Sequence, residues 1–396
     1  MSYLECIECG ASYPSNEARY TCDCGGLLEV IYDGIPSRTD FSGPLGVWRY
    51  SSVLPIETAG SVSLDEGGTP LYDAEKLSRE LNVDLYVKHE GMNPTGSFKD
   101  RGMTVGVSKA VELGIERVAC ASTGNTSAAL AAYGAAADIP AVVLLPEGKV
   151  ALGKVAQALM HGATLVELDG NFDECLRIVR GLAEEGFFYV LNSVNPYRLE
   201  GQKTIAFEVL EQLNWEVPDV TVLPVGNAGN ISAIYKGYRE MHEAGIIDEV
   251  PRMVGVQAEG ASPLAAAAKK GGPLEPFESP ETKATAIRIG DPVNAPKARR
   301  AIDATDGDAL SVSDDELIEA QKQLARAEGI GVEPASATSV AGVKKMLESG
   351  DLDEDESVVC VATGHLLKDP DAALEASEEP LKADATAEDV RRVLSE

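Results

Sequence analysis

The stretch NPTGSFKDRGM, residues 93–103, places Lys99 just after a Pro/Gly turn and at the start of an apolar-periodic run. Such a run predicts a helix, so the lysine would stand at the beginning of that helix. A lysine held at such a place can lose its proton and attack a carbonyl carbon, whereas an exposed surface lysine stays charged. Because most lysines are exposed, the stretch alone is also compatible with an ordinary solvated lysine.

Around this stretch, short β-rich runs alternate with helical segments, among them residues 97–113, 125–137, 171–185 and 229–244. Such alternation is typical of a largely parallel sheet with helices on both faces, so the expected fold class is α/β. In these sheets ligands bind beyond the carboxyl ends of the strands, where turns lead into helices. The expected strands are 85–87, 118–120, 141–145, 163–166, 189–191, 220–223, 253–256 and 358–361.

The composition is that of a globular and strongly acidic protein. The 396 residues include 64 acidic and 34 basic side chains, giving a formal charge of −30, and 44% are hydrophobic. Nucleic acid and anionic membranes repel a polyanion, so neither is expected as a partner. The charge exceeds what solubility requires and favours adaptation to high salt, which screens self-repulsion, over a plainly solvated surface. With no apolar run of transmembrane length and no signal-peptide pattern, a cytoplasmic location is expected.

Four of the seven cysteines stand close together near the N-terminus: Cys6, Cys9, Cys22 and Cys24. Two close pairs of thiolates suit tetrahedral zinc, although the second pair has one intervening residue and not the usual two. Disulfides are the alternative, which a cytoplasmic setting disfavours. We expect a structural zinc site in a small ribbon-like unit. The remaining cysteines stand in apolar runs and are expected in the core: Cys120, Cys175 and Cys360.

Two turns after expected strands have the composition of ligand-binding loops. The turn Gly226-Asn227-Ala228-Gly229-Asn230 follows the run at 220–223, and its glycines let backbone N–H groups turn inward at a helix N-terminus, which suits a phosphate. Taken alone, a plain tight turn explains it better. The turn at 121–127 follows the run at 118–120 and is compatible with a helix-capping cluster.

Together these segments resemble the pyridoxal-phosphate (PLP) enzymes of the tryptophan-synthase-β class and, within it, the threonine synthase family. The resemblance spans nearly the whole chain and implies fold-type II, with two open twisted sheets. It also implies that Lys99 bonds to the cofactor's aldehyde and that Asn125 meets the ring hydroxyl. Gly226 to Asn230 would hold the PLP phosphate, and Thr363 would meet the pyridine nitrogen. A hydroxyl cannot keep that nitrogen protonated as a carboxylate would, which suits elimination and replacement. Many archaeal members carry a similar zinc-ribbon-like piece, and the acidic composition is like that of a haloarchaeal form.

The same resemblance implies a phosphorylated amino acid as substrate. In threonine synthases an Asn-Ser and an Arg similar to Asn192, Ser193 and Arg198 bind the phosphate of O-phosphohomoserine. The fork of an arginine matches a phosphate, although a surface arginine at a helix end has the same sequence signature. Ser122 and Thr126 are then expected near the substrate's carboxylate or phosphate. The implied lyase reaction of threonine biosynthesis turns O-phospho-L-homoserine and water into L-threonine and phosphate.

Other functions stay open on sequence grounds. Cysteate synthase, which uses O-phosphoserine and sulfite, is a close relative, and serine/threonine dehydratase is a third reading, although its substrate has no phosphate. A catalytically silent PLP-fold binding protein is the alternative from a different class. The family resemblance suggests a homodimer. The expected division is a Cys-rich unit, a discontinuous PLP-binding domain, a small domain and an acidic tail, at residues 1–35, 36–100 with 200–380, 101–199, and 381–396.

Overall fold

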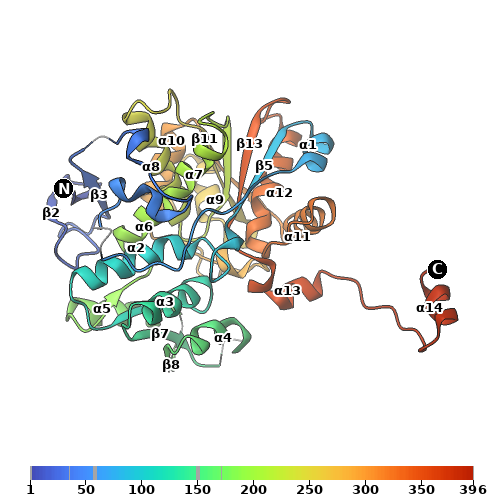
Figure 1. The fold of residues 1–396 in the computed structure, drawn as a ribbon, viewed down its shortest axis with the longest axis horizontal. Coiled ribbons are helices and arrows are strands. Elements are labelled where there is room, and N and C mark those ends of the chain that lie inside the picture. Colours follow the sequence, from blue (N-terminus) through green and yellow to red (C-terminus); the bar gives the residue numbers. More distant parts are fainter. Residues whose placement is uncertain (1, 35, 57–59, 149–151, 171, 396) are drawn as a thin grey trace.

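The computed structural model describes residues 2–34, 36–56, 60–148, 152–170 and 172–395, and these form three sheets (Figure 1). Two are open sheets flanked by helices, and the third is a small N-terminal ribbon that carries the four clustered cysteines. This arrangement confirms the α/β class expected from the sequence. The division into domains at the expected boundaries stays a prediction.

The larger sheet has the strand order β12 (Asp308–Val312), β11 (Arg252–Ala258), β10 (Val220–Pro224), β13 (Ser357–Ala362), β5 (Asp84–His89) and β4 (Leu71–Asp73). All neighbours are parallel except β4, which pairs antiparallel with β5 at the edge. Because β10, β13 and β5 are adjacent and parallel, their carboxyl ends open at one edge of the sheet. The residues that follow Pro224, Ala362 and His89 are therefore brought together.

Helices cover both faces of this sheet. One face packs against α1 (Glu75–Leu81), α11 (Asp314–Gln323) and α12 (Pro334–Ser349). The other packs against α7 (Thr204–Gln212), α8 (Gly229–Glu243), α9 (Pro263–Lys270) and α10 (Ala295–Ala304). Successive side chains of a strand point to opposite faces, which is why Val358 and Cys360 lie in one core and Val359 and Val361 in the other.

The smaller sheet is wholly parallel, in the order β8 (Thr164–Leu168), β7 (Ala141–Pro146), β6 (Val118–Ala121) and β9 (Tyr189–Val190). Its core with α2 (Lys99–Glu112), α3 (Asn125–Ala136) and α4 (Leu152–Met160) lies on one face, and α5 (Phe172–Glu184) packs on the other. The turns after β6 and β9 lead into α3 and α6 (Pro196–Gln202). These are the turns that the sequence marks as ligand-binding.

The remaining segments are smaller. The ribbon has the antiparallel order β2 (Ser12–Pro14), β1 (Ser2–Cys6), β3 (Leu28–Tyr32). The Pro/Gly-rich connector after it contains the short 3₁₀ helices η1 (Arg38–Asp40) and η2 (Val47–Val53). After α13 (Pro370–Glu375), the acidic tail extends away from the body and ends in α14 (Ala387–Val393) (Figure 1). Among the described helices, none is long and apolar enough to cross a membrane.

Candidate active site

Lys99 is the first residue of α2, at the edge where β5 and β13 end. The preceding turn is fixed to the segment after β13 by backbone hydrogen bonds. The N–H of Phe98 donates to the carbonyl of Thr363 at 3.0 Å, and the N–H of His365 donates to that of Gly96 at 2.9 Å. The structure therefore joins the segment of Lys99 directly to the segment of Thr363, which the sequence predicts as two parts of one site.

A buried ion network anchors the first turn of α2 (Glu90, Lys88, Arg101 and Glu208). The guanidinium of Arg101 donates to Glu90 at 2.6 and 2.8 Å and to Glu208 at 2.6 and 2.7 Å. The amine of Lys88, on β5, donates to Oε2 of Glu208 at 2.8 Å, an oxygen that also accepts from Arg101. All these side chains are fully buried. Two residues beyond Lys99, the helix is thus tied to both the sheet and α7.

The amine of Lys99 lies where its charged form is disfavoured. Loss of water around it, together with the nearby charge of Arg198, lowers the pKa of Lys99 to about 7, while Glu333 opposes the shift. The amine lies 4.2 Å from the centre of the Phe98 ring. Near neutral pH a large fraction of this amine is unprotonated and able to attack a carbonyl.

We therefore expect acylation of Lys99 in the cofactor-free protein to rise with pH and to reach half its maximum near pH 7. Below this pH the amine carries a proton and has no lone pair to donate, and above it the neutral amine predominates. The measurement is acetic anhydride labelling at a series of pH values, with Lys99 quantified by peptide mass spectrometry. A rate for Lys99 that keeps rising through pH 9 would contradict the lowered pKa.

The turn Gly226–Asn230 lies between β10 and α8 and has the form of an anion cradle. Ala228 has the left-handed conformation, with φ of 61°, at the N-cap of α8. The side chain of Asn230 donates back to the carbonyl of Pro224 at 2.5 Å and fixes the turn. Among the described residues, none accepts a hydrogen bond from the backbone N–H groups of 226–230. Free donors at a helix N-terminus suit the phosphate that the sequence analysis places there.

Asn125 and Thr363 meet at a carboxylate that the sequence analysis did not identify, Glu333. The amide of Asn125 donates to both oxygens of Glu333 at 3.1 Å, and the hydroxyl of Thr363 donates to one of them at 3.3 Å. Ser336, one turn into α12, lies 3.0 Å from the Thr363 hydroxyl. Burial raises the pKa of Glu333, partly offset by the Asn125 hydrogen bond. The one local signal for Glu333 is its position before Pro334, at the start of a helix.

Arg198, on α6, is buried with an incompletely paired guanidinium. It is 1% exposed, and Nη1 donates to the carbonyl of Leu191 at 2.9 Å. Its Nε and Nη2 have no hydrogen-bond partner among the described residues. Burial lowers the pKa of Arg198 to about 10, so it is still cationic at neutral pH. A buried cation with two unpaired donors is costly unless an anion completes it.

The other predicted substrate residues lie on the two turns of the smaller sheet. Ser122 and Thr126 flank the start of α3 and are partly exposed, as is Ser193 after β9. Asn192 has a different use in the structure, since its side chain exchanges hydrogen bonds of 3.0 and 2.9 Å with the backbone of Ala121. It therefore bridges the two turns, and its role as a phosphate ligand stays a prediction.

A second residue missed by the sequence analysis is Asn294, at the N-cap of α10. Its backbone N–H donates to the carbonyl of Asn227 at 3.1 Å, and its side chain donates to that of Ser193 at 3.0 Å. Asn294 thus connects the anion cradle of the larger sheet to the substrate turn of the smaller one. The carboxyl edges of the two sheets face a common site.

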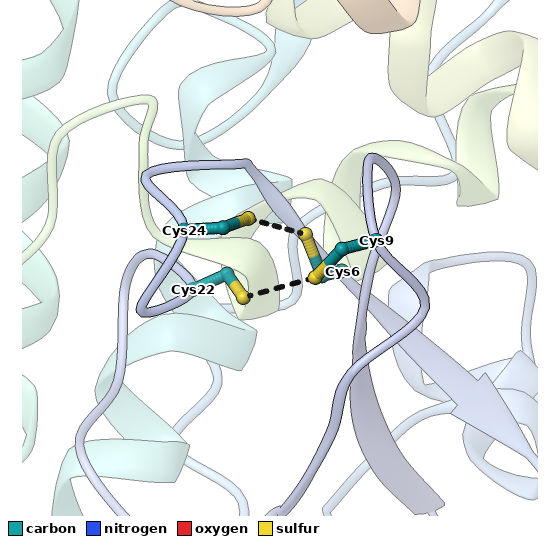
Figure 2. Close-up of side chains that lie close together, drawn as sticks. All are labelled: Cys6, Cys9, Cys22 and Cys24. Atoms are coloured by element: carbon teal, nitrogen blue, oxygen red, sulfur yellow. Dashed lines mark hydrogen bonds between the residues drawn. The ribbon is translucent and has the colours of Figure 1, made fainter.

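The four N-terminal cysteines lie close together and form a second candidate site (Figure 2). Their sulfur atoms all lie within 4.8 Å of one another, with Cys6 to Cys24 at 3.6 Å and Cys9 to Cys22 at 3.5 Å. Four sulfurs about 2.3 Å from a tetrahedral zinc would stand about 3.8 Å apart, whereas a disulfide needs about 2.05 Å. The geometry fits a metal better than disulfides, and all the cysteines are free thiols.

A turn closes each cysteine pair. The N–H of Gly10 donates to the carbonyl of Cys6 at 3.0 Å, and the N–H of Gly25 donates to that of Cys22 at 2.9 Å. Both glycines have positive φ, 72° and 90°. The second turn accommodates one residue fewer and still aims both sulfurs inward, so the unusual spacing does not prevent a four-sulfur cluster.

Comparison with known proteins agrees with this geometry. The model of a family described as pyridoxal-phosphate dependent enzyme matches residues 62–364, which include Lys99, Asn125, the anion cradle and Thr363. The processed form of threonine deaminase isoform 2 from Solanum lycopersicum has a similar fold, with a TM-score of 0.68 at 21% identity, over 87% of this chain and all of that one. The site and the fold thus define a pyridoxal-phosphate-dependent enzyme.

Two curated relatives identify the family within this class of pyridoxal-phosphate-dependent enzymes. The chain is 58% identical to the threonine synthase of Methanocaldococcus jannaschii over 99% of each protein. It is 59% identical to that of Methanosarcina acetivorans over 100% of this chain and 99% of the other. The chain belongs to the threonine synthase family.

Proposed function

We propose that this chain converts O-phospho-L-homoserine and water into L-threonine and phosphate. The observation that carries the proposal is the buried guanidinium of Arg198, whose Nε and Nη2 have no hydrogen-bond partner in the described part of the chain. Its charge also helps to lower the pKa of Lys99. A reactive amine near a buried cation that can still donate hydrogen bonds suits a phosphorylated amino acid. The threonine synthases that resemble this chain over nearly its whole length support the same activity.

The residues fit pyridoxal phosphate. The free N–H groups of residues 226–230 would hold its phosphate, Asn125 its ring hydroxyl, Thr363 its ring nitrogen and Lys99 its aldehyde carbon. When bound, the cofactor supplies an electron sink that makes C–H bonds of the substrate acidic. Ser336 and Glu333 lie within hydrogen-bond distance of the Thr363 hydroxyl and hold its side chain at this edge. As a neutral group, this hydroxyl does not hold the ring nitrogen protonated.

Lys99 is the proposed proton carrier. With substrate bound, its free amine would take the proton from Cα, since its lowered pKa leaves it unprotonated near neutral pH. That proton would have to leave the amine before it could take a second one from Cβ. Arg198, with Asn192, Ser193, Ser122 and Thr126, would hold the phosphate as its bond to Cγ breaks. The buried setting of Arg198 strengthens its attraction to that leaving group.

Replacing Arg198 by alanine is expected to lower kcat/KM for phosphohomoserine by about 10- to 100-fold, which corresponds to about 1.5–3 kcal/mol for hydrogen bonds to a charged group. The assay follows threonine and phosphate together. Arg299→Ala, which removes an exposed arginine from α10, is the control and should leave kcat/KM unchanged.

Phosphoserine, free serine and free threonine are the test substrates that distinguish the alternative enzymes. Sulfite-dependent phosphate release from phosphoserine would favour a cysteate synthase, and turnover of free serine or threonine would favour a dehydratase. A purified protein that binds no pyridoxal phosphate would favour a silent binding protein. An unchanged kcat/KM in Arg198→Ala would contradict the proposal that Arg198 binds the substrate's phosphate.

We also propose that the four clustered cysteines hold a structural zinc ion. The sulfur distances and the turns at Gly10 and Gly25 support this assignment. A cytoplasmic location belongs to the same proposal, because seven free thiols suit a reducing compartment.

The remaining proposals concern assembly and salt. The charge of −30 supports adaptation to high salt, and the family resemblance suggests a homodimer. Sedimentation of the pure protein over a series of KCl concentrations tests the dimer, which a monomer at every concentration excludes. Urea unfolding over the same series tests the adaptation, which is excluded if stability does not increase with salt.

A further inference from the structure

The Cys-rich unit, residues 2–32, makes contacts that bear on the proposed substrate site. We use the term substrate arm for residues 189–202, which comprise β9, the turn with Asn192 and Ser193, and α6 with Arg198. Strand β3 of the Cys-rich unit lies beside α6 (Figure 1). The contacts between the two are specific hydrogen bonds and buried side chains on both sides of Arg198.

The first contact fixes the start of the arm. The hydroxyl of Tyr20 accepts a hydrogen bond of 2.8 Å from the N–H of Val190, and the Tyr20 and Tyr189 rings lie 5.8 Å apart. The carbonyl of Val190 in turn accepts from the side chain of Asn195 at 2.9 Å. Asn195 caps α6 by accepting from the N–H of Tyr197. Tyr20 is therefore connected, through the backbone of one residue, Val190, to the N-terminus of the helix that carries Arg198.

The second contact is apolar. Tyr197, the neighbour of Arg198, is fully buried in the same core cluster as Cys6 and Cys22. Its hydroxyl donates to the carbonyl of Ser15 at 3.0 Å. Two of the four cluster cysteines thus belong to the wall against which α6 packs, so the shape of that wall depends on how the sulfurs are held.

The third contact is electrostatic and lies one turn further along α6. The hydroxyl of Tyr32 donates to Glu200 at 2.6 Å, and Glu200 also accepts from Lys203 at 2.7 Å and from Lys236. The two lysine charges outweigh burial and lower the pKa of Glu200 to about 2, so it is ionised under all working conditions. The end of the arm is therefore also tied to the Cys-rich unit.

On the side opposite the Cys-rich unit, the substrate arm packs closely against α2. A Cβ at Gly201 would lie 1.7 Å from the carbonyl oxygen of Arg101, and one at Gly102 would lie 2.8 Å from that of Arg198. Helices α6 and α2 are in backbone contact, and α2 begins at Lys99. A shift of α6 toward or away from the Cys-rich unit therefore changes where Arg198 stands relative to Lys99.

We propose that the metal-held Cys-rich unit is a positioning element for the substrate arm, so that loss of its metal weakens anion binding at Arg198 while the cofactor stays bound. The inference rests on the proposed function of Arg198 as a phosphate ligand. A unit of this size has too little core to hold its shape alone, since below about 40 residues a metal or disulfides are usually needed. The anion cradle 226–230 belongs to the larger sheet and is carried by β10 and α8.

The test uses the holoenzyme and inorganic phosphate as the probe. Zinc is first measured in the wild-type protein, with one ion per chain expected. Cys9→Ser removes an exposed ligand, and Tyr20→Phe removes only the contact to Val190. Both should weaken phosphate binding by about three- to tenfold and raise KM for phosphohomoserine at unchanged kcat, with cofactor absorbance retained. Amide hydrogen exchange of residues 189–202 should increase in Cys9→Ser.

Tyr3→Phe is the matched control, because Tyr3 lies in the same unit and its hydroxyl has no hydrogen-bond partner among the described residues. It should change neither phosphate affinity nor exchange. Wild-type protein that holds no metal overturns the proposal. So does a zinc-free Cys9→Ser with wild-type phosphate affinity and exchange, and where Cys9→Ser does not fold, an unchanged Tyr20→Phe overturns it.

Arg198→Ala, measured beside these variants, separates the two levels of the argument. If it leaves phosphate affinity unchanged, the proposed function of Arg198 fails. If it abolishes phosphate binding while Cys9→Ser and Tyr20→Phe do not weaken it, only the positioning role fails.

Discussion

Replacing Lys99 by alanine is expected to lower the rate of threonine formation by more than about a thousandfold and to remove the visible absorbance of the lysine-bound cofactor. Lys99 is the amine placed at the carboxyl edge of β5 and β13, with a pKa lowered to about 7 by burial and by Arg198. In the Lys99→Ala variant, a water molecule that took the place of the amine could not supply both the covalent bond to the cofactor and the proton transfers. The measurements are an absorbance spectrum and a threonine assay of the purified variant.

Lys368 is the natural control because its amine lies near the same site. It donates to the carbonyl of Thr95 at 3.1 Å and to Gln157, so its hydrogen bonds hold it in a structural position. Lys368→Met should keep the absorbance of the lysine-bound cofactor. If Lys99→Ala retained a borohydride-reducible lysine adduct and Lys368→Met lost it, the assignment of Lys99 would be wrong.

Local patterns in the sequence predict much of the fold. Every expected strand overlaps an observed one, and the helices expected at 97–113, 125–137, 171–185 and 229–244 are α2, α3, α5 and α8. These elements are strongly periodic or follow clear Gly-rich turns, so neighbouring residues suffice to identify them. The sequence analysis did not identify β12, whose place depends on a partner strand distant in the chain, β11, or β4, an edge strand of only 3 residues.

The residues of the candidate site likewise fall into those that local sequence identifies and those that it does not. Lys99 and the cradle 226–230 stand in motifs that local sequence defines. Glu333 could not be found in this way, because its importance comes from contacts with Asn125 and Thr363, on other elements. Asn294 is similar, since it matters only because two turns meet there.

The direction of a side chain is the other property that sequence does not define. Arg198 was expected to bind phosphate, and the structure adds that two of its nitrogen atoms, Nε and Nη2, are buried with no partner among the residues that the structure describes. Asn192 was expected beside it, but its amide is occupied by the backbone of Ala121. Both orientations depend on contacts with the ends of β6 and β9 in the smaller sheet, which no single motif encodes.

Replacing Glu208 by alanine is expected to lower the free energy of unfolding by about 3–5 kcal/mol, because it breaks a fully buried ion network from its centre. Glu208 accepts hydrogen bonds from Lys88 at 2.8 Å, from Arg101 at 2.6 and 2.7 Å, and from the N–H of Gly68 at 2.8 Å. Without it, Arg101 keeps its pair with Glu90, whereas the buried amine of Lys88 is left with the neutral acceptors Thr69 and Gln212. Urea unfolding of variant and wild type measures the difference.

Glu75→Ala is the matched control for this variant. Glu75 pairs with Arg79 at 3.3 Å on α1, and the two side chains are 72% and 73% exposed, so its loss should cost less than about 1 kcal/mol. A similar loss of stability in both variants would contradict the argument that burial makes the Glu208 network costly to break.

The pH dependence gives the same network a second signature. The charges of Arg101 and Lys88 outweigh burial and lower the pKa of Glu208 to about 2, below the ordinary value of 4.5. A carboxyl with a depressed pKa in the folded state contributes stability that is present above the unfolded pKa and is lost as pH falls toward the folded one. Wild-type protein should therefore lose part of its stability between about pH 4.5 and 2, and Glu208→Ala should lose less over that range, since the group that takes up the proton is absent. Because Arg101 stands two residues after Lys99, the loss of stability in Glu208→Ala should also release the start of α2. In this variant the Lys99 amine should therefore become accessible to acylation at lower urea concentrations than in the wild type.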